Sequence, residues 1–111
     1  MDRTGEYREL VKKIIERHAA FKPANGVIEP EIIFDEARNH YELMYDGWQG
    51  HRRVHGSVIH VQIRAGKIWI QHDGTEGGVA EELVEAGVPR EHIVLGFHPE
   101  YKRKYTNFAA G

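Results

Sequence analysis

The sequence contains no cysteine, and this absence removes several classes of function at once. Disulfide scaffolds, thiolate catalysis, iron–sulfur clusters and cysteine-built zinc sites are all excluded. The amino-terminal stretch MDRTGEYREL is charged and lacks the apolar core of a secretory signal. No apolar run approaches the roughly 20 residues that a membrane-spanning helix requires. Together these absences predict a soluble, cytoplasmic protein.

The chain also has little excess charge of either sign, because 15 basic residues are balanced by 17 acidic ones. A formal charge of −2 supplies no overall field for holding a phosphate backbone, so contact with nucleic acid needs a local basic patch. The sequence also lacks a GKS or GKT phosphate loop, a GxGxxG fingerprint, a nucleophile elbow and zinc-finger spacing. At 111 residues the chain is predicted to form a single domain, residues 1–111.

A helical pattern opens the chain between Asp2 and about Phe21. Asp2 or Thr4 is expected to cap its start, and the segment from Lys22 to Gly26 is expected to form a loop. The apolar residues that trace one face of this helix are Tyr7, Leu10, Val11, Ile14, Ile15 and Phe21.

Strands are predicted next, from side chains that alternate with a period of two. They cover residues 32–34, 40–48, 53–64 and 67–72, with turns at 47–50 and at Ala65-Gly66. Short connections between them imply an antiparallel meander, because parallel neighbours need long crossovers.

A second helical stripe follows the strands, and residues 93–97 form a final short apolar strand. Gly87 is expected just after the end of that helix, with Pro89 beyond it. The order of elements predicts an α+β fold: a long N-terminal helix, an antiparallel meander sheet, a second helix and a short final strand. The residues of the second stripe are Val79, Ala80, Leu83 and Val84.

The hairpin over residues 53–72 has two different faces if Ala65-Gly66 is a two-residue turn. Trp69 on its polar face is either shielded by neighbouring Arg and Gln stems or an anchor for a partner, since Trp and Arg are common interface anchors. The core face is expected to hold Ile59, Val61, Ile63, Ile68, Ile70 and, at its end, His72. The polar face, predicted to bind a partner, carries His60, Gln62, Arg64, Trp69 and Gln71.

The stretch QHDGTE, residues 71–76, places His72, Asp73 and Glu76 where the hairpin meets the second helix. With Asp73 as N-cap and Glu76 three residues later, it forms an Asp-x-x-Glu version of the capping box. A structural corner therefore accounts for these residue types, and no catalytic residue is predicted. The alternative is a small metal-dependent hydrolase or nuclease that uses these three side chains.

The eight histidines raise the question of a metal site. His51, His55 and His60 are close in sequence, but a regular strand puts His55 and His60 on opposite faces. No H-E-x-x-H or comparable ligand spacing occurs. We therefore expect no metal ligand and no cofactor, and leave open a site assembled from separate strands.

The C-terminal segment is basic and aromatic. Lys102, Arg103 and Lys104, interleaved with tyrosines, are suited to contact phosphates while the rings stack on bases. The favoured alternative is a solvated segment whose aromatic residues dock on the core.

Three motifs occur in order along the chain: GW-x-G, GKIWIQ-x-DGTE and GVP-x-x-x-IVLGFH. They lie in the stretches IFDEARNHYELMYDGWQGHRRVHGSVIHVQIRAGKIWIQHDGTE and GVAEELVEAGVPREHIVLGFHPEYKRKYTNFA. In these motifs the chain resembles the XisI proteins, the fdxN-element excision controlling factors of cyanobacteria. The resemblance runs from Tyr7 to Phe108, and the closing FAAG is a minor departure.

The resemblance implies a role in excising a DNA element that interrupts a nitrogen-fixation gene during heterocyst differentiation. A separate recombinase performs strand exchange there, and the companion protein XisH resembles nuclease folds. The family therefore suggests a non-enzymatic accessory factor that binds, restrains or directs a XisH-like protein. It supplies no established catalytic residues to carry over.

The sequence thus predicts a partner-binding factor that uses the polar hairpin face and the basic tail. The competing hypotheses are the hydrolase described above and direct DNA binding through Lys102, Arg103 and Lys104. A homodimer through the free sheet face is a further expectation, and it would compete with the partner for the same surface. No membrane association is expected.

Overall fold

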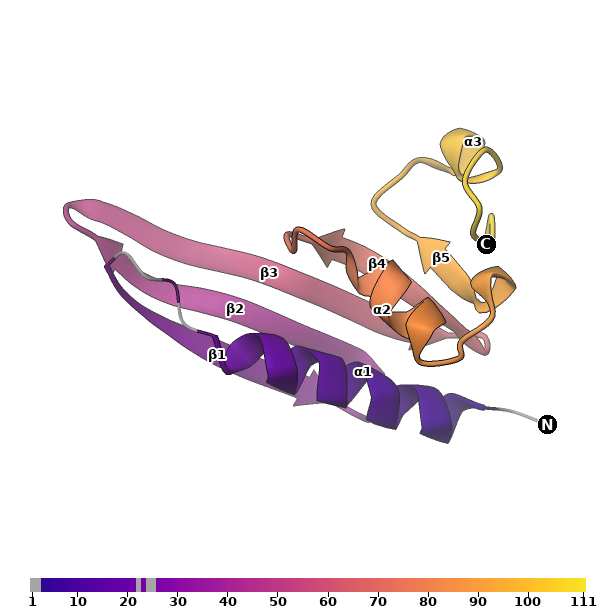
Figure 1. The fold of residues 1–111 in the computed structure, drawn as a ribbon, viewed down its shortest axis with the longest axis horizontal. Coiled ribbons are helices and arrows are strands. Elements are labelled where there is room, and N and C mark those ends of the chain that lie inside the picture. The colour runs from indigo at the N-terminus through magenta and orange to yellow at the C-terminus, as the bar shows by residue number, and fades with distance from the viewer. Residues whose placement is uncertain (1–2, 22, 24–25) are drawn as a thin grey trace.

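The sequence folds into one five-stranded sheet with its two longer helices on one side (Figure 1). A computed structural model describes residues 3–21, 23 and 26–111. Its elements are α1 (Thr4–Ala19), β1 (Val27–Asp35), β2 (His40–Gln49), β3 (Arg52–Arg64), β4 (Lys67–Asp73), α2 (Val79–Glu85), a 3-10 turn (Arg90–His92), β5 (Ile93–Leu95) and α3 (Glu100–Arg103).

The strand order in space is the order in sequence, β1-β2-β3-β4-β5. Strands β1 to β4 pair antiparallel, as their short connections predict. Strand β5 pairs parallel to β4, because α2 lies between them in sequence and returns the chain to the same end of the sheet. The predicted α+β fold is confirmed.

The turn between β3 and β4 confirms the register predicted for that end of the hairpin. Ala65 and Gly66 both have positive φ, 53° and 76°, as a two-residue turn that follows the strand twist requires. Arg64 therefore pairs with Lys67, and Gln62 pairs with Trp69.

Two element boundaries differ from the sequence prediction. Strand β1 begins at Val27 instead of residue 32, and the turn expected at 47–50 is confined to residues 50 and 51. Gly47 lies inside β2, where a Cβ would stand only 2.0 Å from the carbonyl oxygen of Val27. Gly47 therefore marks a close approach of β1 and β2 and not a turn.

The ends of α1 only partly match the predicted caps. Arg3 is the N-cap residue and makes no side-chain cap bond, while Thr4 is already the first helical residue. Asp2 lies outside the described residues, as does most of the predicted loop after the helix.

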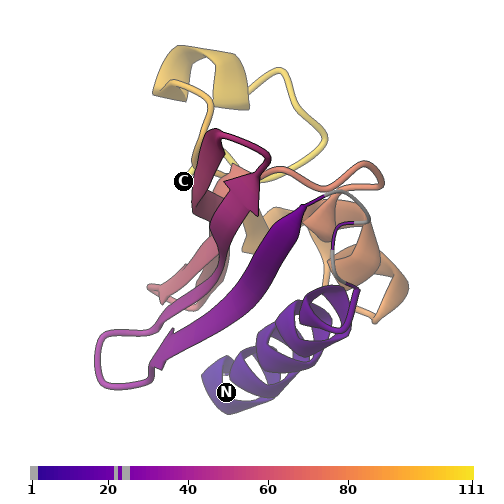
Figure 2. The ribbon, with the colours of Figure 1, turned by 90° about the vertical axis from the view of Figure 1, so that its left-hand side faces the viewer.

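The core lies between the sheet and the two longer helices, α1 and α2. Figure 2 shows α1 on one side of the sheet and the C-terminal end on the other. Tyr41 and Leu43 of β2 are fully buried under the helices, and so is Ile15 of α1. The apolar stripes predicted for the two helices supply Tyr7, Val11, Ile14, Ile15, Val79, Ala80 and Leu83 to this core.

Helix α2 ends as predicted but begins later than the capping box implies. Gly87 has φ 100°, its N–H donates to the carbonyl of Val84, and the N–H of Val88 donates to the carbonyl of Leu83. The N-cap residue is Gly78, so Glu76 is not at N3 and the Asp73 capping box is wrong. Residues 74–78, which the capping box would have placed in the first turn of the helix, form a loop instead.

Two β-bulges interrupt the sheet and change which side chains share a face. Val58 is the extra residue of β3 opposite β2, and Gln71 is the extra residue of β4 opposite β3. His55 and His60 therefore lie on the same face, contrary to prediction, because their partners Asp46 and Glu42 in β2 do.

His72 is also misplaced by the sequence prediction. The bulge at Gln71 pairs His72 with His60 instead of Ile59, so His72 leaves the core row and is exposed. A single unpaired residue thus moves the side chains that follow it in the strand to the opposite face of the sheet.

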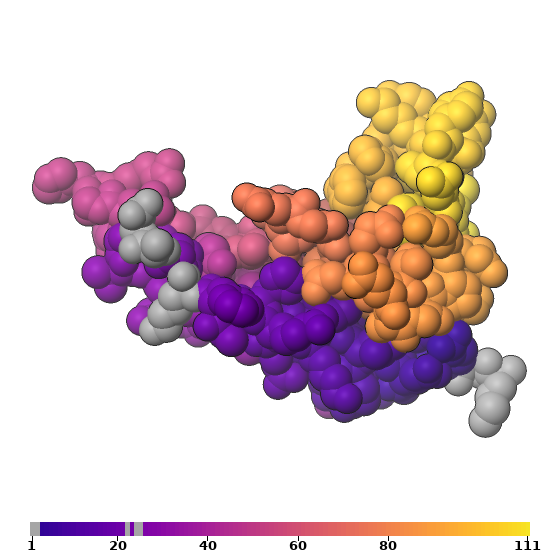
Figure 3. Space-filling view, in the orientation of Figure 1, coloured from indigo at the N-terminus to yellow at the C-terminus, as the bar shows by residue number. Residues whose placement is uncertain are grey.

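The β2–β3 hairpin projects past the end of α1, which gives the molecule its length of 47 Å (Figure 3). No helix within the described ranges is both long and apolar enough to cross a membrane.

Candidate interaction surface

The sheet face away from α1 and α2, here called the outer face, carries the residues predicted to bind a partner. His60, Gln62 and Arg64 alternate along β3 beside Trp69 of β4. Gln71, although bulged, lies with them, because its Nε2 donates to Oε1 of Gln62 at 3.3 Å. The sequence therefore assigned these five side chains to one face correctly, and their role stays a prediction.

Trp69 is less exposed than its position on an uncovered sheet face suggests. The guanidinium carbon of Arg64 lies 3.8 Å from the centre of a Trp69 ring, and that of Arg103 lies 5.1 Å from it. The side chain is consequently half-buried beside two cations. We call these three residues the arginine–tryptophan stack.

The C-terminal segment reaches the outer face and covers its β5 end. Ala109 donates its N–H to the carbonyl of Ile93 at 2.8 Å and forms a bridge with Val94, beyond the sheet edge. The ammonium of Lys67 then donates to the carbonyl of Gly111. Val94 is fully buried outside the main core cluster, as expected for a side chain beneath this segment.

The three basic residues predicted to contact DNA have different surroundings. Arg103 is half-buried, and its Nε donates to the carbonyl of His98 at 2.9 Å. Lys102 and Lys104 are exposed. The two lysines therefore project into solvent, Lys104 with its ammonium 5.3 Å from the centre of the Tyr105 ring, while Arg103 joins the tail to the sheet.

Histidines gather at the centre of the outer face. Nδ1 of His40 lies 3.0 Å from Nε2 of His60, and His72 pairs with His60 across the strands. Burial lowers the pKa of His60 below its ordinary value, with a smaller contribution from the neighbouring imidazoles, and Glu42 opposes the shift. His60 thus favours its neutral form.

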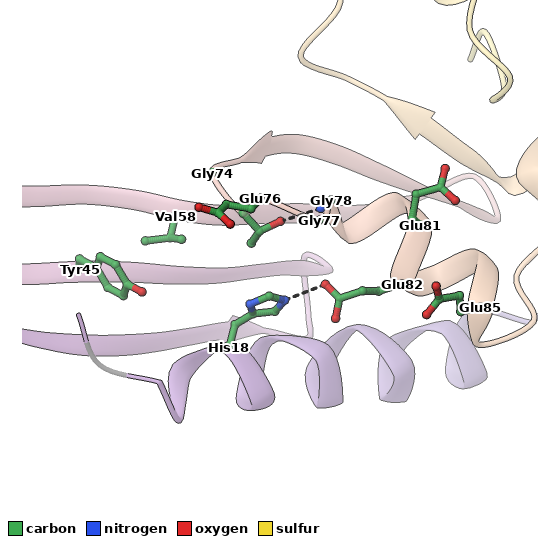
Figure 4. Close-up of a pocket in the computed structure, with 11 residues that line it drawn as sticks. His18, Tyr45, Val58, Gly74, Glu76, Gly77, Gly78, Glu81, Glu82 and Glu85 are labelled. Atoms are coloured by element: carbon green, nitrogen blue, oxygen red, sulfur yellow. Dashed lines mark hydrogen bonds and ion pairs between the residues drawn. The ribbon is translucent and has the colours of Figure 1, made fainter. Parts of the chain in front are cut away.

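A cleft of about 510 Å³ lies on the helix-covered side of the sheet (Figure 4). The end of α1, the bulge at Val58, the loop 74–78 and α2 enclose it. His18 faces Glu82 across the cleft, with Nε2 2.7 Å from the carboxylate. Arg17 also bonds Glu82, at 3.2 Å, so this carboxylate is occupied by a contact that joins α1 to α2.

The three residues considered as a catalytic site do not converge. His72 is exposed on the outer face, whereas Glu76 lines the cleft on the opposite side of the sheet. Asp73 accepts hydrogen bonds from the N–H and hydroxyl of Thr75, at 2.9 and 2.6 Å, and from the N–H of Val79 at 2.7 Å. Asp73 thus holds the loop to the start of α2, which is a structural role.

In the part of the chain that the structure describes, no three His, Cys, Asp or Glu side chains come together in a way that could hold an ion.

Sequence reasoning missed His40, His18 and Glu82. All three acquire their neighbours through long-range pairing: His40 meets His60 across β2 and β3, and His18 meets Glu82 between two helices. The period-two pattern of residues 40–48 places His40 and Glu42 on one face, but the partner strand is offset by the bulge at Val58. Only the spatial register reveals these pairs.

The family model described as XisI protein matches residues 1–110. The chain belongs to the XisI family. No curated protein matches it.

Two solved structures show how far the XisI fold is shared. A XisI-like protein from Anabaena variabilis ATCC 29413 is 46% identical, with 96% of this chain and 97% of that one covered and a TM-score of 0.89. The fdxN element excision controlling factor XisI from the same organism is 34% identical, with 99% and 100% covered and a TM-score of 0.84. The helix-and-sheet architecture described above is therefore that of the XisI family.

Proposed function

We propose that this XisI-family chain is a non-enzymatic accessory factor that controls the excision of a DNA element and acts by binding a XisH-like protein. The element is one of the fdxN type, excised in cyanobacteria during heterocyst differentiation. Two features support the proposal: membership of the XisI family, and a relative at 34% identity that carries the name of excision controlling factor.

The arginine–tryptophan stack is the observation that carries the binding role. Arg64 and Arg103 come from β3 and α3, and both lie against the one indole of Trp69. A guanidinium held by a ring loses less side-chain entropy when it binds a carboxylate than a free one does. The net charge of the chain is −2, but the two arginines make this part of the surface locally positive. Such a surface favours a partner that presents acidic groups to it.

The outer face suits binding better than chemistry. Its polar side chains lie on the open surface of a sheet, whereas active sites are usually concave. Asp73, the carboxylate considered as a catalytic group, is already engaged by Thr75 and Val79. These features support an interaction surface on the outer face.

The proposal is tested by co-expressing the untagged chain with a tagged XisH-like protein, followed by affinity purification and size-exclusion chromatography. A stable complex of fixed stoichiometry is expected. Recovery of the two folded proteins as separate species would contradict it. Running the chain alone on the same column reports whether it forms the homodimer that would occupy the same face.

Direct DNA contact is a second candidate, favoured by the α3 region. Lys102 and Lys104 are exposed there beside Tyr101 and Tyr105, whose rings are also exposed. Cations next to free aromatic rings are what backbone contact and base stacking require. Arg103 contributes less to this candidate, because it is held by Trp69 and by the His98 carbonyl.

A further inference from the structure

His40 and His60 form a cross-strand pair whose ring nitrogens point at each other. Nδ1 of His40 lies 3.0 Å from Nε2 of His60, the ring centroids are 5.2 Å apart and the ring planes differ by 33°. Both side chains are half-buried on the outer face. A polar pair at this distance shares one proton or one cation.

The backbone fixes the pair from both sides. His40 is the first residue of β2, paired with Gln62, and His60 is paired with Glu42, so the imidazoles are diagonal neighbours. The bulge at Val58 places His60 in this register. Diagonal positions on an antiparallel pair are within reach of long side chains, and rigid strands hold ligands more precisely than loops do.

We infer that the outer face holds a binding site for one divalent late transition-metal ion, of the Ni²⁺ or Cu²⁺ class, between Nδ1 of His40 and Nε2 of His60. Imidazole nitrogens bind such ions at about 2.0–2.1 Å, and two ligands at a right angle are then about 2.9 Å apart. The observed 3.0 Å fits this arrangement. A tetrahedral ion separates its ligands by about 3.4 Å, so the spacing favours ions with square or octahedral geometry.

The surroundings keep His60 available as a ligand. Burial lowers the pKa of His60, which favours the neutral ring that a metal requires. The charged and titratable groups that act on His60 are Glu42, whose negative charge attracts a cation, and the two other histidines, His40 and His72. No third protein ligand converges among the described residues, so water completes the coordination and the site stays open.

This site is separate from the proposed function, because it needs neither a partner protein nor the basic tail. The test uses the tag-free full chain, freed of metal with a chelator and titrated calorimetrically with NiCl₂ at about pH 7.5, where most imidazole is neutral. One Ni²⁺ per chain is expected. His40→Gln and His60→Gln should each weaken binding by about tenfold or more, because either change removes one of two ligands.

His51→Gln is the matched control, since it removes an exposed imidazole at the β2–β3 turn. It should leave the affinity unchanged. Equal effects of all three substitutions would show adventitious binding to surface histidines and would overturn the site. So would unchanged affinity in both His40→Gln and His60→Gln.

A spectroscopic measurement on the unmodified chain makes the test independent of how the variants fold. Electron paramagnetic resonance of one equivalent of Cu²⁺ should show two equatorial imidazole nitrogens. Coupling to a single nitrogen would contradict a site shared by His40 and His60.

Discussion

Arg103 of α3 lies over a ring of Trp69 on β4, with its guanidinium carbon 5.1 Å from the ring centroid. This contact joins two regions that the sequence suggested separately, the polar hairpin face and the basic tail. Arg64 lies over the same indole at 3.8 Å, so both arginines occupy one surface. A partner that contacts the hairpin face therefore also meets the C-terminal segment.

Asp73→Ala is expected to reduce the free energy of unfolding by about 1–2 kcal/mol. Asp73 accepts bonds from Thr75 and from the first N–H of α2, and the substitution leaves these donors without a protein acceptor. Urea denaturation measures the effect. Glu76→Ala, at an exposed neighbouring position, is the control and should change stability by less than about 0.5 kcal/mol. Equal stability of the two variants would show that Asp73 does not hold this corner.

Gly47→Ala is expected to destabilise the chain by more than about 2 kcal/mol. An added Cβ meets the carbonyl oxygen of Val27 at 2.0 Å, and backbone atoms have to separate to admit it. Gly56→Ala is the matched control, because its Cβ meets no atom within 4 Å in the adjacent strand. Thermal unfolding of both variants checks this. A Gly47→Ala chain as stable as Gly56→Ala contradicts the close approach of β1 and β2.

The free energy of unfolding is expected to decrease as pH decreases, partly through His60. Its folded pKa lies below the ordinary value of 6.5, because burial disfavours the imidazolium. As pH decreases below about 6.5 the unfolded chain binds the proton first, so the free energy of unfolding declines until the folded pKa is passed. His60→Gln removes this contribution and should flatten the decline. Identical pH dependence in the variant and the parent protein would exclude a lowered pKa.

Lys102 and Lys104 provide the test of direct DNA binding. If the α3 region contacts phosphates, affinity for duplex DNA should fall steeply with salt, and Lys102→Ala/Lys104→Ala should reduce the slope by about 2. Fluorescence anisotropy at several salt concentrations measures both quantities. Lys13→Ala on α1 provides a control lysine elsewhere on the surface. A slope that the double variant leaves unaltered rules out this contact.

Local patterns in the sequence sufficed for most of the fold. The spacing of Tyr7, Val11 and Ile14 by four and three residues identified the buried face of α1, and Gly87 identified the end of α2. The Ala65-Gly66 turn determined which residues of β3 and β4 pair near it. Each of these features depends on residues close together in the chain.

The rest depended on contacts between distant segments. The bulges at Val58 and Gln71 carry no residue-type signature, and they moved His55 and His72 to a face that a regular hairpin does not predict for them. Shielding of Trp69 by a neighbouring arginine was one of the two alternatives, but the contribution of Arg103 was not visible, because Arg103 comes from an element beyond β5. The sequence therefore predicted which five residues share the outer face, but not which side chains surround them.

The most direct test of the account is the affinity of the purified chain for a XisH-like protein, measured by calorimetry for Trp69→Ala and Trp48→Ala. Trp48 is the matched control, an indole that is 50% exposed at the far end of β2 with Arg53 beside it. We predict that Trp69→Ala weakens binding by about 2 kcal/mol, roughly thirtyfold, and that Trp48→Ala does not. Circular dichroism verifies that both variants are folded. Unchanged affinity in Trp69→Ala, or a loss confined to Trp48→Ala, would contradict a partner surface built on the arginine–tryptophan stack.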